Sequence, residues 1–208
     1  MERNAEQLNA LREDILREIA NIGAGHAACA LSALVGRPIV QSVPAVRFVP
    51  LQELAETLGG AEKLVAAGLL NLSGDFSGSL LIVLDFAQAE KLISMIKGNP
   101  ADRNESFGFS AMDESVLSET VNILGGSYLT AIAEFTGLAA YPSVPFLCVD
   151  MVGAVISVPA AESGKTGDYA VLFQSELFNE TDRIVGDLFL IPNAGSCERL
   201  LEALGFAQ

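Results

Sequence analysis

Hydrophobic residues recur at helical spacing near the start of the chain and predict one long helix over residues 8–35. At 100° per residue, one line of this helix carries the apolar residues expected to face the core: Leu11, Ile15, Ile19 and Ile22. A second line, at the shoulder of that face, carries two carboxylates, a carboxamide and a glycine: Asp14, Glu18, Asn21 and Gly25. A solvated helix face more often carries Lys, Glu and Gln. These polar groups beside a bare backbone therefore favour contact with a partner.

The same polar stripe recurs 101 residues later, on a second helix predicted over residues 112–136. Its members are Ser115, Glu119, Asn122 and Gly126. The correspondence runs without a gap for about 30 residues, which predicts an internal duplication. It includes the segments Ser42-Val43-Pro44 and Ser143-Val144-Pro145. What both copies keep is a requirement either of the fold or of a site.

The rest of the pattern repeats the order helix, strands, helix. In the first half we expect a proline-interrupted edge strand over 39–49, a short helix over 51–58, a hairpin of strands 67–74 and 78–85, and a helix over 87–96. In the second half we expect a proline-interrupted strand over 140–149, a further strand segment over 152–158, a loop over 162–168, a hairpin of strands 169–175 and 184–191, and a helix over 197–204.

This order predicts an α+β fold, an internally duplicated pseudo-two-fold domain in which a mainly antiparallel sheet is flanked by two long helices and shorter ones. We expect one domain over residues 1–208, made of repeats 8–98 and 110–205 with a linker over about 99–109. The sequence leaves open which strands meet at the axis between the repeats.

Charge and cysteine content narrow the class of protein. The formal net charge is −14, which disfavours nucleic acid and anionic membrane surfaces and suits a protein partner that presents Lys or Arg. We see no signal peptide and no apolar run as long as a membrane span. The three cysteines are widely spaced and odd in number, so we expect reduced, buried thiols in a cytoplasmic protein.

Several kinds of catalytic chemistry are absent. The segment Ser163-Gly164-Lys165-Thr166 resembles the end of a phosphate-binding loop, but Pro159 stands where the leading glycine belongs. His26 is the only histidine, which excludes histidine-based metal sites, and we expect it to pack between helices. A metal shared by Asp14 and Glu18 is disfavoured because Ser115 replaces Asp14 in the second copy.

The double motif points to a known family. The motif consists of Asp or Ser, followed by Glu, Asn and Pro, and it occurs twice with the same spacing. Its two copies are Asp14, Glu18, Asn21 and Pro44, and Ser115, Glu119, Asn122 and Pro145. This pattern resembles the CheC family of chemotaxis phosphatases, which also includes CheX and FliY, and the resemblance covers residues 11–205. Both motifs are intact, whereas CheX is similar to a single-site version. FliY carries an additional flagellar-switch domain, for which we expect no room in a chain ending at Gln208.

The resemblance implies hydrolysis of the aspartyl phosphate on the chemotaxis response regulator CheY. By family analogy, Asn21 and Asn122 hold the attacking water, and Glu18 and Glu119 pair with the receiver's lysine. The neighbouring positions that would contact the substrate are Asp14, Ser115, Gly25 and Gly126. No cofactor of the chain's own is expected, because the magnesium belongs to the receiver domain. An acyl phosphate needs only a well-placed water, so positioning and electrostatics can supply the acceleration.

The prolines of the motif, Pro44 and Pro145, are expected to shape the strand beneath each helix rather than touch the substrate. The family resemblance also implies a second partner, the receptor deamidase CheD. Asp150 interrupts an apolar stretch over 146–158, and its counterpart is Val49, so the shared fold does not explain the acid. We predict that Asp150 lies at an exposed strand end and marks a CheD-docking surface. A turn acid without a partner is the alternative.

Two functions compete with the phosphatase. The chain could act as a non-catalytic protein that docks CheD, or as a component of the flagellar switch. The two intact Glu–Asn pairs favour the enzyme.

Overall fold

The computed structural model describes residues 2–101, 108–162 and 169–205. Its elements, in chain order, are α1 (Glu2–Val35), β1 (Val40–Pro50), the 3₁₀ helix η1 (Leu51–Glu53), α2 (Leu54–Thr57), β2 (Leu64–Gly74), β3 (Gly78–Asp85), α3 (Phe86–Lys97), α4 (Ala111–Thr136), β4 (Ala140–Pro142), β5 (Phe146–Met151), α5 (Val152–Glu162), β6 (Tyr169–Phe178), β7 (Arg183–Pro192) and α6 (Ala194–Ala203). Parts of the predicted linker, 102–107, and of the predicted loop, 163–168, lie outside the described residues.

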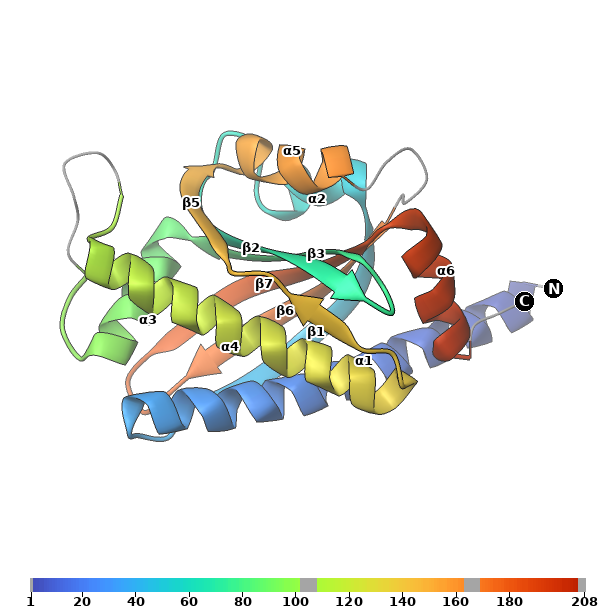
Figure 1. Ribbon diagram of the computed structural model, residues 1–208, viewed down its shortest axis with the longest axis horizontal. Coiled ribbons are helices and arrows are strands. Elements are labelled where there is room, and N and C mark those ends of the chain that lie inside the picture. The colour runs from blue at the N-terminus through green and yellow to red at the C-terminus, as the bar shows by residue number, and fades with distance from the viewer. Residues whose placement is uncertain (1, 102–107, 163–168, 206–208) are drawn as a thin grey trace.

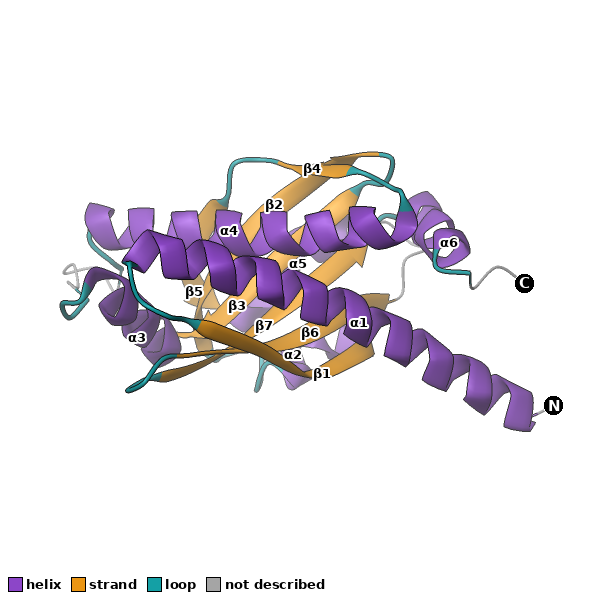
Figure 2. Cartoon of the chain, turned by 90° about the horizontal axis from the view of Figure 1, so that it is seen from below, coloured by secondary structure: helices purple, strands orange, loops and turns teal. Residues whose placement is uncertain are grey.

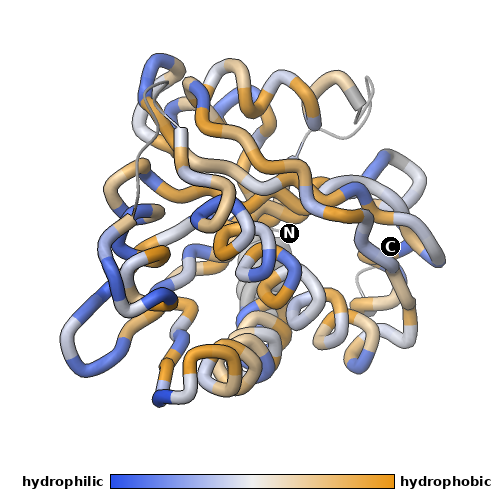
Figure 3. The backbone as a smooth tube through the Cα atoms, turned by 60° about the vertical axis from the view of Figure 1, so that its left-hand side comes forward, coloured by the Kyte–Doolittle hydropathy of each residue, from blue (hydrophilic) through white to orange (hydrophobic). Residues whose placement is uncertain are grey.

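The described strands form one seven-stranded antiparallel sheet in the order β1-β6-β7-β3-β2-β4, with β5 also paired to β2. The long helices α1 and α4 cover one face, α2 and α5 cover the other, and α3 and α6 lie at opposite ends (Figure 1). The larger apolar cluster lies under the long helices and the smaller one under α2 and α5. Hydrophobic positions concentrate in the strands and hydrophilic ones in peripheral loops (Figure 3). The predicted α+β architecture is confirmed.

Each proline-containing strand pairs with the hairpin of the other half of the chain. β1, which follows α1, pairs with β6, and β4 and β5, which follow α4, pair with β2. The hairpins meet at β3 and β7, where Leu81 faces Phe189. These two residues correspond at a sequence offset of 108. A residue that faces its own counterpart lies at the axis relating the halves, so the axis passes between β3 and β7.

The prediction of a strand over 152–158 is wrong, because this segment is the helix α5. Its buried residues, Val152, Val155 and Pro159, stand at helical spacing and cover the smaller apolar cluster. The first two amides of the helix donate to backbone carbonyls, Val152 N to Lys63 O at 2.9 Å and Gly153 N to Ala61 O at 2.9 Å. The loop before β2 thus satisfies donors that the first turn of a helix leaves unpaired.

The core face of α1 is centred about one residue later than the predicted line. Its buried residues are Leu16, Ile19, Ala20, Gly23, Ala24, Ala27 and Leu31, whereas Ile15 and Ile22 are only half-buried. The side chain of Leu11 lies outside the described residues. Glycine and alanine carry no hydrophobic signal in the sequence, yet they allow close packing. A Cβ added to Gly23 would lie 3.1 Å from both Cα and Cγ of Tyr128 in α4.

One part of α1 passes a composition test for a membrane span. The segment Asp14–Val35 is long enough to cross a membrane and contains an 18-residue window with a mean hydropathy of 1.2, which qualifies the expectation that no apolar run is long enough. Core helices pass the same test, and the buried side of this helix contributes to the larger apolar cluster.

Candidate active site

The two helices that carry the motif lie side by side on one face of the sheet and run in opposite directions (Figure 2). Each ends at a glycine in the left-handed region, Gly36 at φ 67° and Gly137 at φ 73°, which stops the helix before the proline-containing strand. The two stripes are therefore carried by neighbouring helices on the same side of the molecule.

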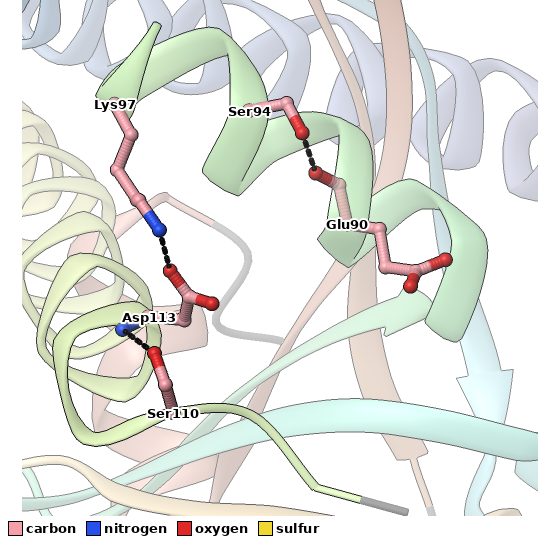
Figure 4. A network of polar contacts seen from close by, with 5 residues as sticks. All are labelled: Glu90, Ser94, Lys97, Ser110 and Asp113. Atoms are coloured by element: carbon pink, nitrogen blue, oxygen red, sulfur yellow. Dashed lines mark hydrogen bonds and ion pairs between the residues drawn. The ribbon is translucent and has the colours of Figure 1, made fainter. Parts of the chain in front are cut away.

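The start of α4 is anchored to the end of α3 (Figure 4). Ser110 caps α4 by accepting a hydrogen bond from the Asp113 amide at 3.3 Å. The fully buried Asp113 carboxylate accepts a bond from Lys97 Nζ at 2.5 Å. This ion pair fixes α4 two residues before the second stripe begins at Ser115.

The first stripe is exposed along its whole length. Asp14, Glu18, Asn21 and Gly25 all lie on the outer side of α1. Gly25 follows the buried Leu16 by nine residues, which is half a turn at 100° per residue. The predicted position at the shoulder of the core face is therefore wrong. The stripe points away from the sheet, where a partner can reach it.

The second stripe has the same placement. Ser115, Glu119 and Asn122 are exposed, and Gly126 is half-buried. A Cβ added to Gly25 or to Gly126 would meet nothing within 4 Å. Each Glu–Asn pair thus stands beside an open stretch of helix backbone.

The side chains of the pairs are available for contact. Within the described residues, the four side chains Glu18, Asn21, Glu119 and Asn122 have no hydrogen-bond or ion-pair partner. Next to them, Arg17 Nη1 donates to Asp14 Oδ1 at 3.0 Å, an exposed pair with no equivalent at Ser115 and Ser118. No group of three His, Cys, Asp or Glu in this described part could hold a metal ion. A carboxylate and a carboxamide one turn apart can together accept a bond from a cation and orient a water.

The motif prolines lie at two strand irregularities. Pro44 falls where the register of the β1–β6 pairing shifts between Ser42 and Ala45. The side chain of Pro44 is not among those that the structure describes. The half-buried Pro145 falls between β4 and β5. Both positions interrupt a strand, and neither proline is part of the exposed stripes on α1 and α4.

Asp150 is exposed near the end of β5, where it faces Val65 of β2. Its carboxylate accepts a hydrogen bond from the Met151 amide at 2.7 Å. The predicted position at an exposed strand end matches the structure. Large apolar side chains are exposed on the same edge: Tyr141, Val144, Phe146 and Met151.

The predicted burial of the histidine and of the three cysteines is wrong. His26 is exposed and does not pack between helices, since it stands on the outer side of α1. The cysteines are free, but Cys29 is exposed, and Cys148 and Cys197 are only half-buried. Partial burial raises the pKa of the Cys148 and Cys197 thiols, helped by the neighbouring acids Asp150 and Glu198.

Sequence reasoning missed a buried polar triangle of Gln41, Tyr128 and Ser175 beneath α4. The three residues come from β1, α4 and β6 and lie far apart in the sequence. Only the strand exchange brings them together, so no local pattern could have signalled them.

Both stripes lie in segments that are similar to a known protein family. The profile of the CheC-like family matches residues 11–47 and 112–148, which contain both stripes. Over 202 residues the chain is 41% identical to the CheY-P phosphatase CheC of Bacillus subtilis (strain 168), covering 95% of this chain and 97% of that one. The chain belongs to the CheC-like family. Both copies of the family's repeat lie at the offset of 101 residues found in the sequence.

Solved structures show the breadth of the CheC-like fold. FliY of Thermotoga maritima superposes with a TM-score of 0.72 at 19% identity, covering 94% of this chain and 96% of that one. The middle domain of FliM from Vibrio alginolyticus gives a TM-score of 0.65 at 14% identity, covering 91% and 99%. At such identities the likeness is one of fold alone.

Proposed function

We propose that this chain hydrolyses the aspartyl phosphate of phosphorylated CheY, the activity for which its Bacillus subtilis relative is named. The observation that carries the proposal is the pair of exposed Glu–Asn stripes, each beside an open glycine, on the outer side of the two long helices. The fold needs neither stripe for packing, yet both copies keep the Glu, the Asn and the glycine.

The proposed mechanism uses positioning without covalent chemistry. The Asn21 or Asn122 carboxamide would hold a water in line with the phosphorus. The Glu18 or Glu119 carboxylate would accept bonds from the receiver's lysine and so fix the docking. Magnesium would belong to the receiver and neutralise the phosphoryl oxygens. Holding water and phosphoryl group in reactive geometry removes much of the entropic part of the barrier.

The test is the decay of phosphorylated CheY, followed with and without this chain at fixed magnesium. The expected result is faster decay that is first order in the chain at low concentration. The decay of acetyl phosphate alone serves as the control and should not change, because docking to the receiver is part of the mechanism. An unchanged decay of phosphorylated CheY would leave a non-catalytic docking or flagellar-switch role as the better interpretation.

A second proposed role is binding of CheD at the β4–β5 edge. Its support is the outer edge formed by β4 and β5, where Val144 is 85% exposed and Phe146 66% exposed beside Asp150. Apolar area bordered by a single acid suits a partner that presents an apolar strip with a cation at its rim. This edge is separate from the stripes of α1 and α4, so both partners can act on one chain.

Charge reversal tests this second role. Asp150→Lys should weaken CheD binding by about 1–3 kcal/mol while leaving dephosphorylation of CheY unchanged. Glu202→Lys, which reverses an exposed acid on α6, is the matched control and should bind CheD normally. Equal affinity of the Asp150→Lys chain for CheD would return Asp150 to a structural strand-end residue.

A further inference from the structure

Tyr128, on the buried side of the second site helix α4, forms a network of hydrogen bonds with two strands. Its side chain is fully buried, and its hydroxyl lies 3.0 Å from Ser175 Oγ on β6. Gln41 Nε2 on β1 donates to the Tyr128 hydroxyl at 3.3 Å and to Ser175 Oγ at 3.1 Å. Burial raises the pKa of Tyr128 to about 12, so the phenol is neutral and holds its partners by hydrogen bonds. The triangle joins α4 to two strands.

The other half of the molecule forms without this triangle. The sequence offset of 101 and the strand pairing place apolar residues at the three corresponding positions: Ala27, Pro142 and Leu70. Among the described residues, Gln41 Oε1 is buried and has no hydrogen-bond partner, which costs free energy. A network that the duplicated fold does not require, and that leaves an acceptor unpaired, is not explained by stability alone.

The first site helix, α1, packs against the same tyrosine. Gly23 of α1 lies against it so closely that an added Cβ would stand 3.1 Å from Tyr128 Cα and Cγ. The ring is fixed from below by Phe173, with ring centroids 5.3 Å apart and a tilt of 52°. Gly23 follows Asn21 by two residues, and Tyr128 follows Asn122 by six. One side chain therefore borders the helices of both stripes near their Asn residues.

We propose that Tyr128 is a positioning residue for both sites. Its hydroxyl fixes α4 on β1 and β6 and so positions Asn122, while its ring packs against α1 and so positions Asn21. This inference rests on the proposed phosphatase function. Catalysis by positioning is sensitive to small shifts, since a displacement of about 1 Å can cost 10²-fold in rate. Loss of the hydroxyl should therefore act on rate more than on docking.

The test separates the two sites and the two parts of the side chain. Tyr128→Phe removes the hydroxyl and keeps the ring. With Asn21→Ala in the background only the second site works, and Tyr128→Phe should lower kcat about tenfold at unchanged KM for phosphorylated CheY. With Asn122→Ala in the background only the first site works, and Tyr128→Phe should leave its kcat within about twofold. Gly23→Ala should lower kcat of the first site and leave kcat of the second site nearly unchanged, because the new methyl displaces α1 from the ring.

Thr120→Val is the matched control. It deletes another buried hydroxyl of α4, but one that bonds within the helix, to the Val116 carbonyl at 2.8 Å. Hydrogen exchange of the α4 amides provides a readout besides activity, and it should quicken around residues 115–126 in Tyr128→Phe and not in Thr120→Val.

The outcomes are distinct. Equal losses of kcat at both sites in Tyr128→Phe, or no loss at all in the folded chain, would overturn the positioning role and leave the phosphatase intact. A wild-type chain without activity would overturn the proposed function and the positioning role together, and the exchange comparison would still show whether the hydroxyl tethers α4.

Discussion

The two site helices present the same outer surface but are attached to the molecule in different ways. At three buried positions that correspond to Val121, Leu124 and Tyr128 of α4, α1 has the small residues Ala20, Gly23 and Ala27. α4 packs through the larger Leu124 and Tyr128. The duplication has therefore kept the outward stripe while the inward contacts have diverged. Features shared by two differently attached helices are best explained by what the helices bind.

The stripes also differ in charge around the shared pair. The first carries Asp14 with Arg17 at 3.0 Å, and the second has Ser115 and Ser118 in their place. The field that each Glu–Asn pair presents to a receiver is thus different. We expect two working sites with unequal rates.

The largest effect is expected from removing both carboxamides. Asn21→Ala with Asn122→Ala should abolish the accelerated decay of phosphorylated CheY, because each Asn is proposed to orient the attacking water, a role worth about 10²-fold or more per site. Both side chains are exposed and bond to nothing described, so the chain should stay folded. Circular dichroism and the urea midpoint are the controls. Near-normal dephosphorylation by the folded double variant would refute the site assignment.

The next effect concerns how α4 is anchored. Asp113→Ala leaves Lys97, whose side chain is only 15% exposed, without this carboxylate, and breaking such a buried pair costs about 3–5 kcal/mol. Asp14→Ala breaks the exposed pair with Arg17 on α1 and should cost less than about 1 kcal/mol. Urea unfolding measures both. Similar losses in the two variants would mean that the buried ion pair does not anchor the second helix more firmly than a surface pair.

The sequence predicted the outer features of the molecule better than its inner contacts. Both long helices and the residues of both stripes follow from the repeat at offset 101, although the stripes lie farther from the core face than predicted. The repeat also contained a signal for α5, since the helix predicted over 51–58 maps onto 152–159. The segment 152–158 is a short apolar run, and such a run is ambiguous because a short buried helix and a buried strand have similar composition.

The contacts between distant segments could not be predicted. Nothing local in β1 indicates that it pairs with β6 instead of β2, since either hairpin offers an apolar edge. The core face of α1 was misplaced because the large Ile15 and Ile22 outweigh Gly23 and Ala27 in any hydropathy pattern. Close helix packing uses the small residues, and their partner Tyr128 lies about one hundred residues away.

A smaller effect is expected when only one carboxamide is removed. Asn21→Ala alone and Asn122→Ala alone should each keep the activity of the other site, so that the two residual rates are unequal and add up to the wild-type rate. The physical reason is that the stripes lie on separate helices and share no described side-chain contact. Single-turnover decay of phosphorylated CheY measures the rates. Complete inactivity of either single variant would show that the sites depend on one another.

The smallest effect distinguishes two glycines of the same helix. Gly23→Ala should destabilise the chain, because its methyl would stand 3.1 Å from Tyr128. Gly25→Ala should instead stabilise it by about 0.5–1 kcal/mol, since alanine is the better helix former and the new methyl meets nothing within 4 Å. The urea midpoints of the two variants give the comparison. A glycine that the fold needs for packing loses stability when it is replaced by alanine. A gain in stability for Gly25→Ala would therefore mean that the open space at Gly25 serves a partner outside the chain. If Gly25→Ala lost as much stability as Gly23→Ala, the glycine would belong to the fold, and the open gap beside Asn21 would cease to support a docking surface.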